Sequence, residues 1–375
     1  YEIGLGIPAE PLFRSGRVGW CAKAVDSLAD RLQFREFRND VFNINEIFKL
    51  NNPDVFFDSA ILSALISSCC FVYISTDDDG YPRLQVIDGA NATGCIDDIT
   101  GLLTEGYAVL ERDDSTKRPT VEAYFAPYQT VIYRKGKEEE IYDHSASYPL
   151  LVPIINRPDA KRPFGHSRIS RACISLVGSA LRTIKRSEIA SEFYSYPQKY
   201  AVGLAQDAEM ADRWKASMSS MLTITKDDDD QHPVVGQFQQ SSMTPHSDQL
   251  RMFAALFAGE TGLTLDDLGF ATENPSSAEA IKAAHENLRL TARKAQKTFG
   301  SGFLNVGYLA ACLRDDWAYR RNQFYLETPI WEPLFEPDMS TMSLIGDGAI
   351  KINQAVPGYF GKTNLRDMTG VEPDE

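Results

Sequence analysis

The chain has 375 residues, a formal net charge of −14 and 43% apolar residues. This length can bury a large core and favours two or three structural units over one. The 24% charged and 11% aromatic fractions are typical of a globular protein, which argues against disorder. An excess of 52 acidic over 38 basic residues argues against a simple cationic DNA-binding protein, because such a chain repels phosphate on average.

No uninterrupted run of about 18 apolar residues occurs, so we expect no membrane span. No signal peptide is visible, and the start at Tyr1 and end at Glu375 suggest a trimmed chain. The cysteines are scattered and form no C-x-x-C pair, which disfavours a zinc site or a disulfide framework. We therefore predict buried free thiols in a reducing compartment for Cys21, Cys69, Cys70, Cys95, Cys173 and Cys312.

The first 160 residues combine helical and strand patterns. Apolar residues recur at helical spacing over residues 20–32 and 55–65. Two β-like runs, 70–75 and 81–87, flank an Asp-Asp-Asp-Gly turn and predict a hairpin. Further strands are predicted at 107–110, 121–125 and 130–133, followed by a polar hairpin or loop at 136–140. A Pro-rich connector at 149–162 is expected to end this region.

Residues 167–194 predict one long amphipathic helix with Ser167 as its N-cap. Its apolar stripe comprises Ile169, Cys173, Leu176, Ala180 and Ile184. The opposite stripe is basic and polar, with Arg168, Arg171, Ser175, Ser179, Arg182 and Arg186. In a monomer we would interpret this stripe as a solvated face.

Pro197 ends that helix, and residues 197–244 predict a compact insert. The insert contains a helix at 208–218, the acidic run Asp227, Asp228, Asp229 and Asp230, and a strand at 234–238. A second long helix is expected from Thr244, an N-cap followed by Pro245, to Gly262.

A polar loop at 263–275 follows, and Ser276 with Glu279 predicts a capping box. The helix it opens should run to Gly300, with Ile281, Ala284, Leu288, Ala292, Ala295 and Phe299 on its apolar face. A further helix at 302–313, an extended segment at 324–335 around Trp331 and a helical tail at 339–370 complete the chain.

No motif of catalysis stands out. The run Asp77 to Asp79 before Gly80 lacks calcium-loop spacing and predicts a turn tip. The acidic run at 227–230 is better explained as a solvated loop than as a weak site for a divalent ion. There is no phosphate-binding loop and no G-x-S-x-G elbow, and the five histidines lack the spacing of metal ligands. We therefore predict no enzyme activity and no cofactor.

The order of these parts carries a resemblance. The segments concerned are Gly165-His166-Ser167-Arg168-Ile169, Glu192-Phe193-Tyr194 with Pro197-Gln198-Lys199-Tyr200, the helix start N-P-S-S-A-E-A-I from Asn274, Tyr124-Phe125-Ala126-Pro127, and Pro153-Ile154-Ile155-Asn156. Together they resemble the siphovirus-type portal proteins of tailed bacteriophages, the head-to-tail connector family, over most of the chain. Their order is more specific than any one segment.

The resemblance implies an α+β, portal-like fold with a mixed α/β wing, a long-helix stem, a small α/β clip insert and a helical crown. The implied parts are a wing at 1–164, a first stem helix at 165–196, a clip at 197–244, a second stem helix at 245–262, a tunnel loop at 263–276, a long helix and wing return at 277–337, and a short crown, looking truncated, at 338–375. It implies a homo-oligomeric ring, typically of twelve subunits, at one capsid vertex. That ring would be a passive channel for DNA packaging and ejection.

The implied partners are the terminase large subunit, a head-to-tail connector or adaptor, the major capsid and scaffold proteins, and double-stranded DNA bound without sequence specificity. The expected location is the virion, after assembly in the bacterial cytoplasm, with no membrane. The tunnel-loop residues Asp266, Asp267, Glu273 and Asn274 would face the DNA. The stem residues Arg168, Arg171, Arg182 and Arg186 would form intersubunit salt bridges or a cationic band facing DNA, with the former slightly preferred. The clip residues Trp214, Asp227, Asp228, Asp229 and Asp230 would contact partners.

Two other hypotheses stay open at this point. One is a metal-dependent nuclease or hydrolase, which would need three or four carboxylates converging on a metal ion. The other is a different virion protein, such as a scaffold-binding or head-completion protein, which the stem, clip, stem order disfavours.

Overall fold

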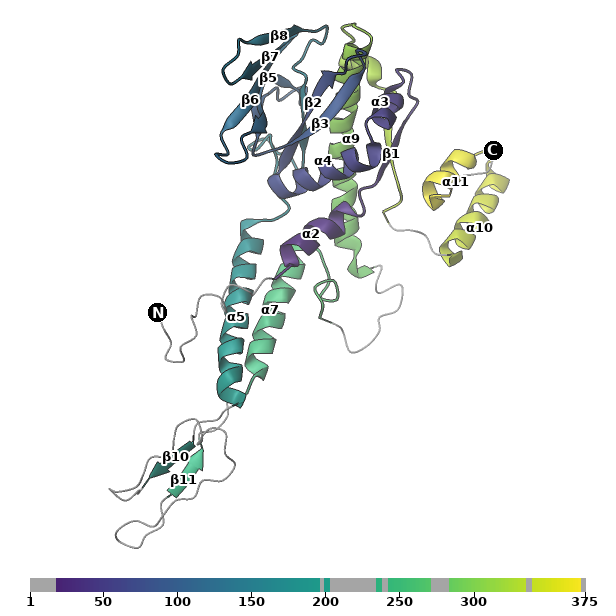
Figure 1. Ribbon diagram of the computed structural model, residues 1–375. Coiled ribbons are helices and arrows are strands. Elements are labelled where there is room, and N and C mark those ends of the chain that lie inside the picture. Colours follow the sequence, from purple (N-terminus) through teal and green to yellow (C-terminus); the bar gives the residue numbers. More distant parts are fainter. Residues whose placement is uncertain are drawn as a thin grey trace. The chain divides into compact units, whose positions relative to one another are not determined.

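The computed structural model describes residues 18–195, 199–202, 234–237, 242–270, 283–334 and 339–371. The chain divides into two compact units, considered separately below. The smaller comprises Tyr1–Cys21, Arg171–Glu260 and Thr264–Glu273, and the larger Ala22–Ser170, Thr261–Leu263 and Asn274–Glu375. Figure 1 labels their helices and strands. No helix within the described ranges is long and apolar enough to cross a membrane.

The larger unit contains a three-stranded antiparallel sheet. Its strands are β2 (Cys69–Thr76), β3 (Pro82–Asp88) and β9 (Leu151–Ile155), in the order β3-β2-β9. The hairpin predicted between the first two is confirmed, with Thr76 opposite Pro82. The Asp77 carboxylate accepts hydrogen bonds from the amides of Asp79 at 3.1 Å and Tyr81 at 2.7 Å. The acidic run is therefore a turn tip, as predicted.

Strand β9 corrects the prediction of a Pro-rich connector at 149–162. Leu151 to Ile154 are buried, and Pro153 lies opposite Phe71 of β2. Proline has no amide to donate, so it is compatible with this strand because β9 is at the edge of the sheet. The proline content of this segment predicted a linker, but its residues 151–154 form a buried strand of the core.

A second, five-stranded sheet lies between β3 and β9 in the sequence. It is an antiparallel meander of β4 (Ala92–Ile96), β5 (Leu103–Arg112), β6 (Pro119–Ala126), β7 (Gln129–Arg134) and β8 (Glu140–Asp143). The strands predicted at 107–110, 121–125 and 130–133 and the hairpin at 136–140 are confirmed. One face is buried through Ala108, Ala123, Phe125, Thr130 and Ile132.

Helices and a short ribbon complete the core of the larger unit. Helices α2 (Trp20–Ala29) and α4 (Pro53–Ser67) match the predictions, although α2 ends before Leu32. Strand β1 (Phe34–Arg38) and helix α3 (Ile44–Leu50) were not predicted. Strand β1 pairs with β12 (Thr328–Trp331), which follows the 3₁₀ turn η1 (Arg321–Phe324) and confirms an extended segment around Trp331.

Helix α9 (Glu286–Arg314) crosses the larger unit as one element of 29 residues. The prediction of two helices separated at Gly300 is therefore wrong. A Cβ at Gly300 would lie 2.7 Å from Pro329 Cγ, and one at Gly302 would lie 2.9 Å from Ile154 Cδ1. These glycines permit close packing rather than ending the helix. Leu288, Ala292, Ala295 and Phe299 are buried, as predicted, whereas the capping box at Ser276 lies outside the described residues.

The predicted helical tail consists of α10 (Met339–Ala355) and α11 (Lys362–Thr369). Helix α11 forms two ion pairs with β1, between Arg366 and Glu36 and between Asp367 and Arg38.

In the described residues of the smaller unit, the longest elements are two helices, α5 (Arg171–Ser195) and α7 (Thr244–Thr261). The second begins at Thr244, as predicted. The first begins at Arg171, so Ser167 is not its N-cap: the Ser167 hydroxyl donates to the Ile66 carbonyl at 2.6 Å. Strands β10 (Lys199–Val202) and β11 (Val234–Gln237) pair antiparallel, which confirms a strand near 234–238. The helix predicted at 208–218 lies outside the described residues.

The cysteine prediction holds in part. Cys69, Cys70, Cys173 and Cys312 are buried and Cys21 is partly buried, all as free thiols. Cys95 is exposed, because it lies on the outer face of the five-stranded sheet, which corrects the prediction for this residue.

Candidate functional site

Helices α5 and α7 lie side by side in the smaller unit (Figure 1). Buried residues on α5 are Cys173, Ala180 and Thr183, and those on α7 are Ala254, Phe257 and Ala258. The Thr183 hydroxyl donates to Gln249 Oε1 across the pair at 3.1 Å. The ring of Trp20 packs against Phe257 with centroids 5.7 Å apart. Cys173 and Ala180 of the predicted apolar stripe are therefore buried as expected, Leu176 and Ile184 are partly buried, and Ile169 precedes α5.

Both helices carry exposed side chains, which are basic and apolar on α5 and apolar on α7. Arg171, Arg182 and Arg186 are exposed on the side of α5 opposite Cys173 and Ala180, as the stripe predicted. Ile174 is 60% exposed on α5, and Leu256 is 54% exposed on α7. Ile189 and Met252 are also exposed large apolar residues. Several exposed large apolar side chains on the same helices are typical of a surface that another molecule covers.

Arg168 requires a correction. It precedes α5 rather than lying on it, and it is only 8% exposed. Its guanidinium donates to the carbonyl oxygens of Ala24, at 3.4 Å, and Thr261. Arg168 therefore satisfies backbone carbonyls inside the larger unit instead of belonging to an exposed stripe. The helical spacing of Arg168 in the sequence did not distinguish this buried arginine from the exposed Arg171, Arg182 and Arg186.

The start of the predicted tunnel loop is a compact turn. Oδ2 of Asp267 accepts hydrogen bonds from the amide and the hydroxyl of Thr264, both at 2.9 Å. Asp266 is exposed, while Leu268 is buried. Of the four loop residues predicted to face DNA, Asp266 thus presents its side chain outward and Asp267 stabilises the turn. Glu273 and Asn274 lie outside the described residues, as do the clip residues Trp214 and Asp227 to Asp230.

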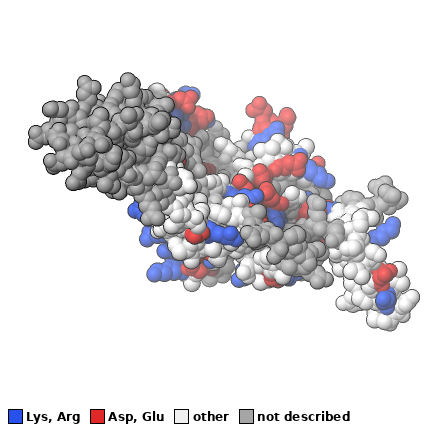
Figure 2. Space-filling view, turned by 90° about the horizontal axis from the view of Figure 1, so that it is seen from below, with Lys and Arg blue, Asp and Glu red and all other residues white. Residues whose placement is uncertain are grey.

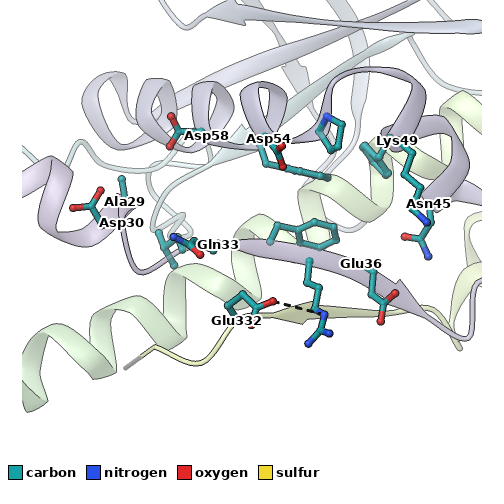
Figure 3. Close-up of a pocket in the computed structure, with 15 residues that line it drawn as sticks. Ala29, Asp30, Gln33, Glu36, Asn45, Lys49, Asp54, Asp58 and Glu332 are labelled. Atoms are coloured by element: carbon teal, nitrogen blue, oxygen red, sulfur yellow. Dashed lines mark ion pairs between the residues drawn. The ribbon is translucent and has the colours of Figure 1, made fainter. Parts of the chain in front are cut away.

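A cavity of about 590 Å³ lies in the larger unit between β1 and the helices α3 and α4 (Figure 3). Acidic and basic side chains line it together: Asp30, Glu36, Asp54, Asp58, Glu332, Arg35 and Lys49. Arg35 Nε lies 3.6 Å from Glu332 Oε1. Within the described parts of the chain, no three His, Cys, Asp or Glu side chains are grouped to hold a metal ion. The sequence patterns did not predict this cavity.

A buried carboxyl that the sequence did not single out lies just before β12. Glu327 is 4% exposed, and burial raises the pKa of its carboxyl to about 7. The amide of Phe42 donates to its Oε1 at 3.3 Å, whereas its Oε2 has no hydrogen-bond partner among the described residues. This group therefore changes charge near neutral pH.

Charge is mixed over the visible surface. On the described part of the face in Figure 2, Lys and Arg side chains alternate with Asp and Glu, and neither sign covers it alone. The net charge of −14 thus coexists with local basic groups such as those of α5.

Comparisons with known proteins bear on the whole chain. No protein-family model matches it. The portal protein of Mycobacterium phage L5 is 22% identical over 396 residues, covering 100% of this chain and 80% of the relative. The portal protein of Mycobacterium phage D29 is 22% identical over 391 residues, covering 98% and 79%.

Solved structures give the same picture for the fold. A chain in the neck of an empty gene transfer agent particle, computed with C6 symmetry, superimposes with a TM-score of 0.55 at 13% identity. A chain in the virion of the native gene transfer agent particle gives 0.51 at 11% identity. Each comparison covers 96% of this chain and 92% of the other.

The chain thus has the mixed α/β fold of chains found in the necks and virions of phage-like particles. The predicted resemblance to portal proteins of tailed bacteriophages is confirmed by two relatives of that name, which match nearly the whole of this chain. These relatives support a function as a portal protein, and neither of them favours the nuclease hypothesis.

Proposed function

We propose that this protein is the subunit of a phage portal, a ring at one vertex of the capsid through which double-stranded DNA enters and leaves. The observation that carries the proposal is the match to two portal proteins along the whole of this chain, rather than over one domain. The fold likeness to neck and virion chains supports it.

The exposed side chains of α5 and α7 give a physical reason for assembly. Ile174, Ile189, Met252 and Leu256 stay exposed in the single chain. Burying such side chains against a neighbour contributes about 25 cal/mol for each Å² of apolar surface removed from water. A head-to-tail contact uses two different surfaces of the subunit, and it closes into a ring when its rotation divides a full turn. We propose twelve subunits, the number that the family resemblance implies.

The parts of the chain take the roles that the resemblance implies. Residues 1–164 and 277–337 form the wing, helices α5 and α7 the stem, and residues 197–244 the clip. Residues 263–276 form the tunnel loop and residues 338–375 the crown. The role of each segment is part of the proposal.

Charge suits a channel that passes DNA without holding it. Twelve copies at −14 each carry about −168 formally. A negative wall repels phosphate and so disfavours tight binding. Asp266 would extend this repulsion into the tunnel loop. Arg171, Arg182 and Arg186 would pair with acidic groups of the neighbouring subunit, in preference to facing DNA.

The role is passive, so the protein itself catalyses no covalent step and needs no cofactor. A separate motor, the terminase large subunit, would dock on the clip during packaging, and a head-to-tail connector would replace it later. The wing would contact the major capsid and scaffold proteins. The protein would be assembled in the host cytoplasm and retained in the virion.

Assembly provides the test. We would measure the light-scattering mass of the purified chain over a wide concentration range and image the same samples by negative stain. Rings of about a dozen subunits with a central hole are expected. A chain that remains monomeric at every concentration, and is also missing from purified particles of its phage, would contradict the proposal.

A further inference from the structure

The five-stranded sheet has one buried and one outer face. The strand registers place Tyr107 of β5 opposite Tyr124 of β6, which in turn lies opposite Val131 of β7. Tyr133 lies opposite Glu122, and Cys95 opposite Glu105. Side chains alternate between faces along a strand, so these residues share the outer face, away from buried Ala108, Ala123 and Phe125.

At the centre of this face, two tyrosines and two glutamates alternate. The Tyr107 hydroxyl donates to Glu122, and the Tyr124 hydroxyl donates to Glu105 Oε2 at 2.9 Å. The Cys95 thiol donates to Glu105 Oε1 at 3.3 Å. Each diagonal pair holds a carboxylate beside an aromatic ring. We call Glu105, Tyr107, Glu122 and Tyr124 the Tyr–Glu face.

The carboxylates of this face lack a basic partner in the part of the chain that the structure describes. Within the described residues, no ion pair involves Glu105 or Glu122. The hydroxyl of Tyr124 and then the thiol of Cys95 lower the pKa of Glu105 by hydrogen bonding to its charged form. The ring of Tyr124 is accessible, at 37% exposed, and so is that of neighbouring Tyr133, at 38%, whereas Tyr107 is partly buried.

We propose that the Tyr–Glu face binds an Arg- or Lys-bearing segment of another protein. A guanidinium can donate to a fixed carboxylate while stacking on an adjacent tyrosine ring, so that ion pairing and cation–π attraction act together. Tyrosine is enriched at protein interfaces because it supplies a large contact area with few rotatable bonds.

Charge argues against two other occupants of this face, nucleic acid and a second copy of the chain. Between Ala92 and Asp143 there are eleven acidic and six basic residues, so this module repels nucleic acid. A second copy of the chain also carries −14, which makes it a poorer match than a basic protein. The inference does not depend on ring formation, because the face belongs to a single chain.

The test uses defined peptides on the full chain. We would titrate a fluorescein-labelled peptide with three arginines separated by glycines, and a twin peptide with glutamines in their place. The double variant Glu105→Gln/Glu122→Gln keeps the shape and the tyrosine hydrogen bonds. Its control, Glu138→Gln/Glu139→Gln, removes two charges from the exposed segment before β8. Thermal unfolding would verify that each variant is folded.

We expect the arginine peptide to bind about tenfold more weakly to the Tyr–Glu face variant and nearly unchanged to the control, since a charge-assisted hydrogen bond contributes about 1.5–3 kcal/mol. Bound peptide should also slow alkylation of Cys95, the exposed thiol on this face. Equal binding by both variants, equal binding of the glutamine peptide, or absence of binding at millimolar peptide would overturn the proposal. Direct binding of labelled short duplex DNA to the chain that the Glu105→Gln/Glu122→Gln variant changes would overturn the proposal in favour of nucleic acid. Loss of self-association in that variant would overturn it in favour of a second copy of the chain.

Discussion

The guanidinium of Arg168 donates a hydrogen bond to the carbonyl oxygen of Thr261, the last residue of α7. It also donates to the carbonyl of Ala24 in α2. The buried arginine thus holds a carbonyl at the end of α7 and a carbonyl within α2. Terminal carbonyls of a helix have no partner within it, so a side chain that reaches them stabilises the helix end.

Replacing Arg168 with alanine should lower the stability of the protein by about 1–3 kcal/mol, because the buried carbonyls lose their donor. The exposed Arg118→Ala change is the matched control and should lie within about 0.5 kcal/mol of the wild type. Urea denaturation of both variants measures the difference. Equal stabilities would show that Arg168 contributes no net hydrogen-bond energy.

A methyl group at Gly300 should disrupt the contact between α9 and β12. Its carbon would lie 2.7 Å from the ring of Pro329, and a proline ring cannot rotate away. We expect Gly300→Ala to cost about 1–3 kcal/mol, despite the better helix propensity of alanine. Gly259 in α7 has no atom within 4 Å of such a position, so Gly259→Ala should instead stabilise by about 0.5–1 kcal/mol. Thermal unfolding measures both stability changes, and changes of the same sign for the two variants would contradict this prediction.

Glu327 should make the stability depend on pH. Its pKa is about 7 in the folded protein and near 4.5 when exposed. Between these values the folded state binds a proton that the unfolded state lacks, so the free energy of unfolding falls as pH rises from about 4.5 through about 7. Glu327→Gln should remove this dependence and be the more stable form at pH 8. Urea midpoints from pH 5 to pH 8 measure it, with exposed Glu138→Gln as the control, and parallel curves for both variants would reject it.

The two aspartates of the 263–276 loop should differ in effect. Asp267→Ala removes the acceptor for two hydrogen bonds from Thr264 and should destabilise the turn by about 0.5–1.5 kcal/mol. Asp266→Ala should reduce packaging if the loop senses DNA, because Asp266 is the exposed aspartate of the loop. Rings should form in both cases. Deletion of the loop that leaves packaging unchanged would remove any role in DNA contact.

The exposed arginines of α5 can be assigned by one experiment. Changing Arg171, Arg182 and Arg186 together to glutamine should weaken the ring if they pair across subunits, and the loss should match that caused by high salt in the wild type. If ring mass stays constant while packaging falls, the arginines face DNA instead. Circular dichroism of the variant should match that of the wild type, which would show that neither outcome is caused by unfolding.

Much of the fold follows from local patterns. The hairpin around Gly80, the meander strands, α4 and the start of α7 at Thr244 and Pro245 each carry a short-range signal that the structure confirms. Strand β9 escaped prediction because Pro153 and Pro158 outweighed a short apolar run whose partner, β2, is remote in sequence. No local pattern reports such a pairing.

The site was less predictable for a similar reason. Arg168 and Arg171 look alike in the sequence, yet one is buried and the other exposed, because the helix begins between them. Gly300 reads as a helix end, yet Pro329 and Ile154 approach the helix closely at Gly300 and Gly302. The diagonal Tyr–Glu pairs depend on strand register, which alternation alone does not determine.

Cys69 of β2 pairs with Ile155 of β9, so all five strands of the meander lie in the stretch of sequence between these two paired strands. The meander pairs only consecutive strands, so its contacts are local and can form quickly, whereas β2 and β9 meet only after a long loop has closed. Closure entropy rises only logarithmically with loop length. The turns between the strands of the meander can therefore lengthen or shorten at little cost in closure entropy, while β2 and β9 keep their register.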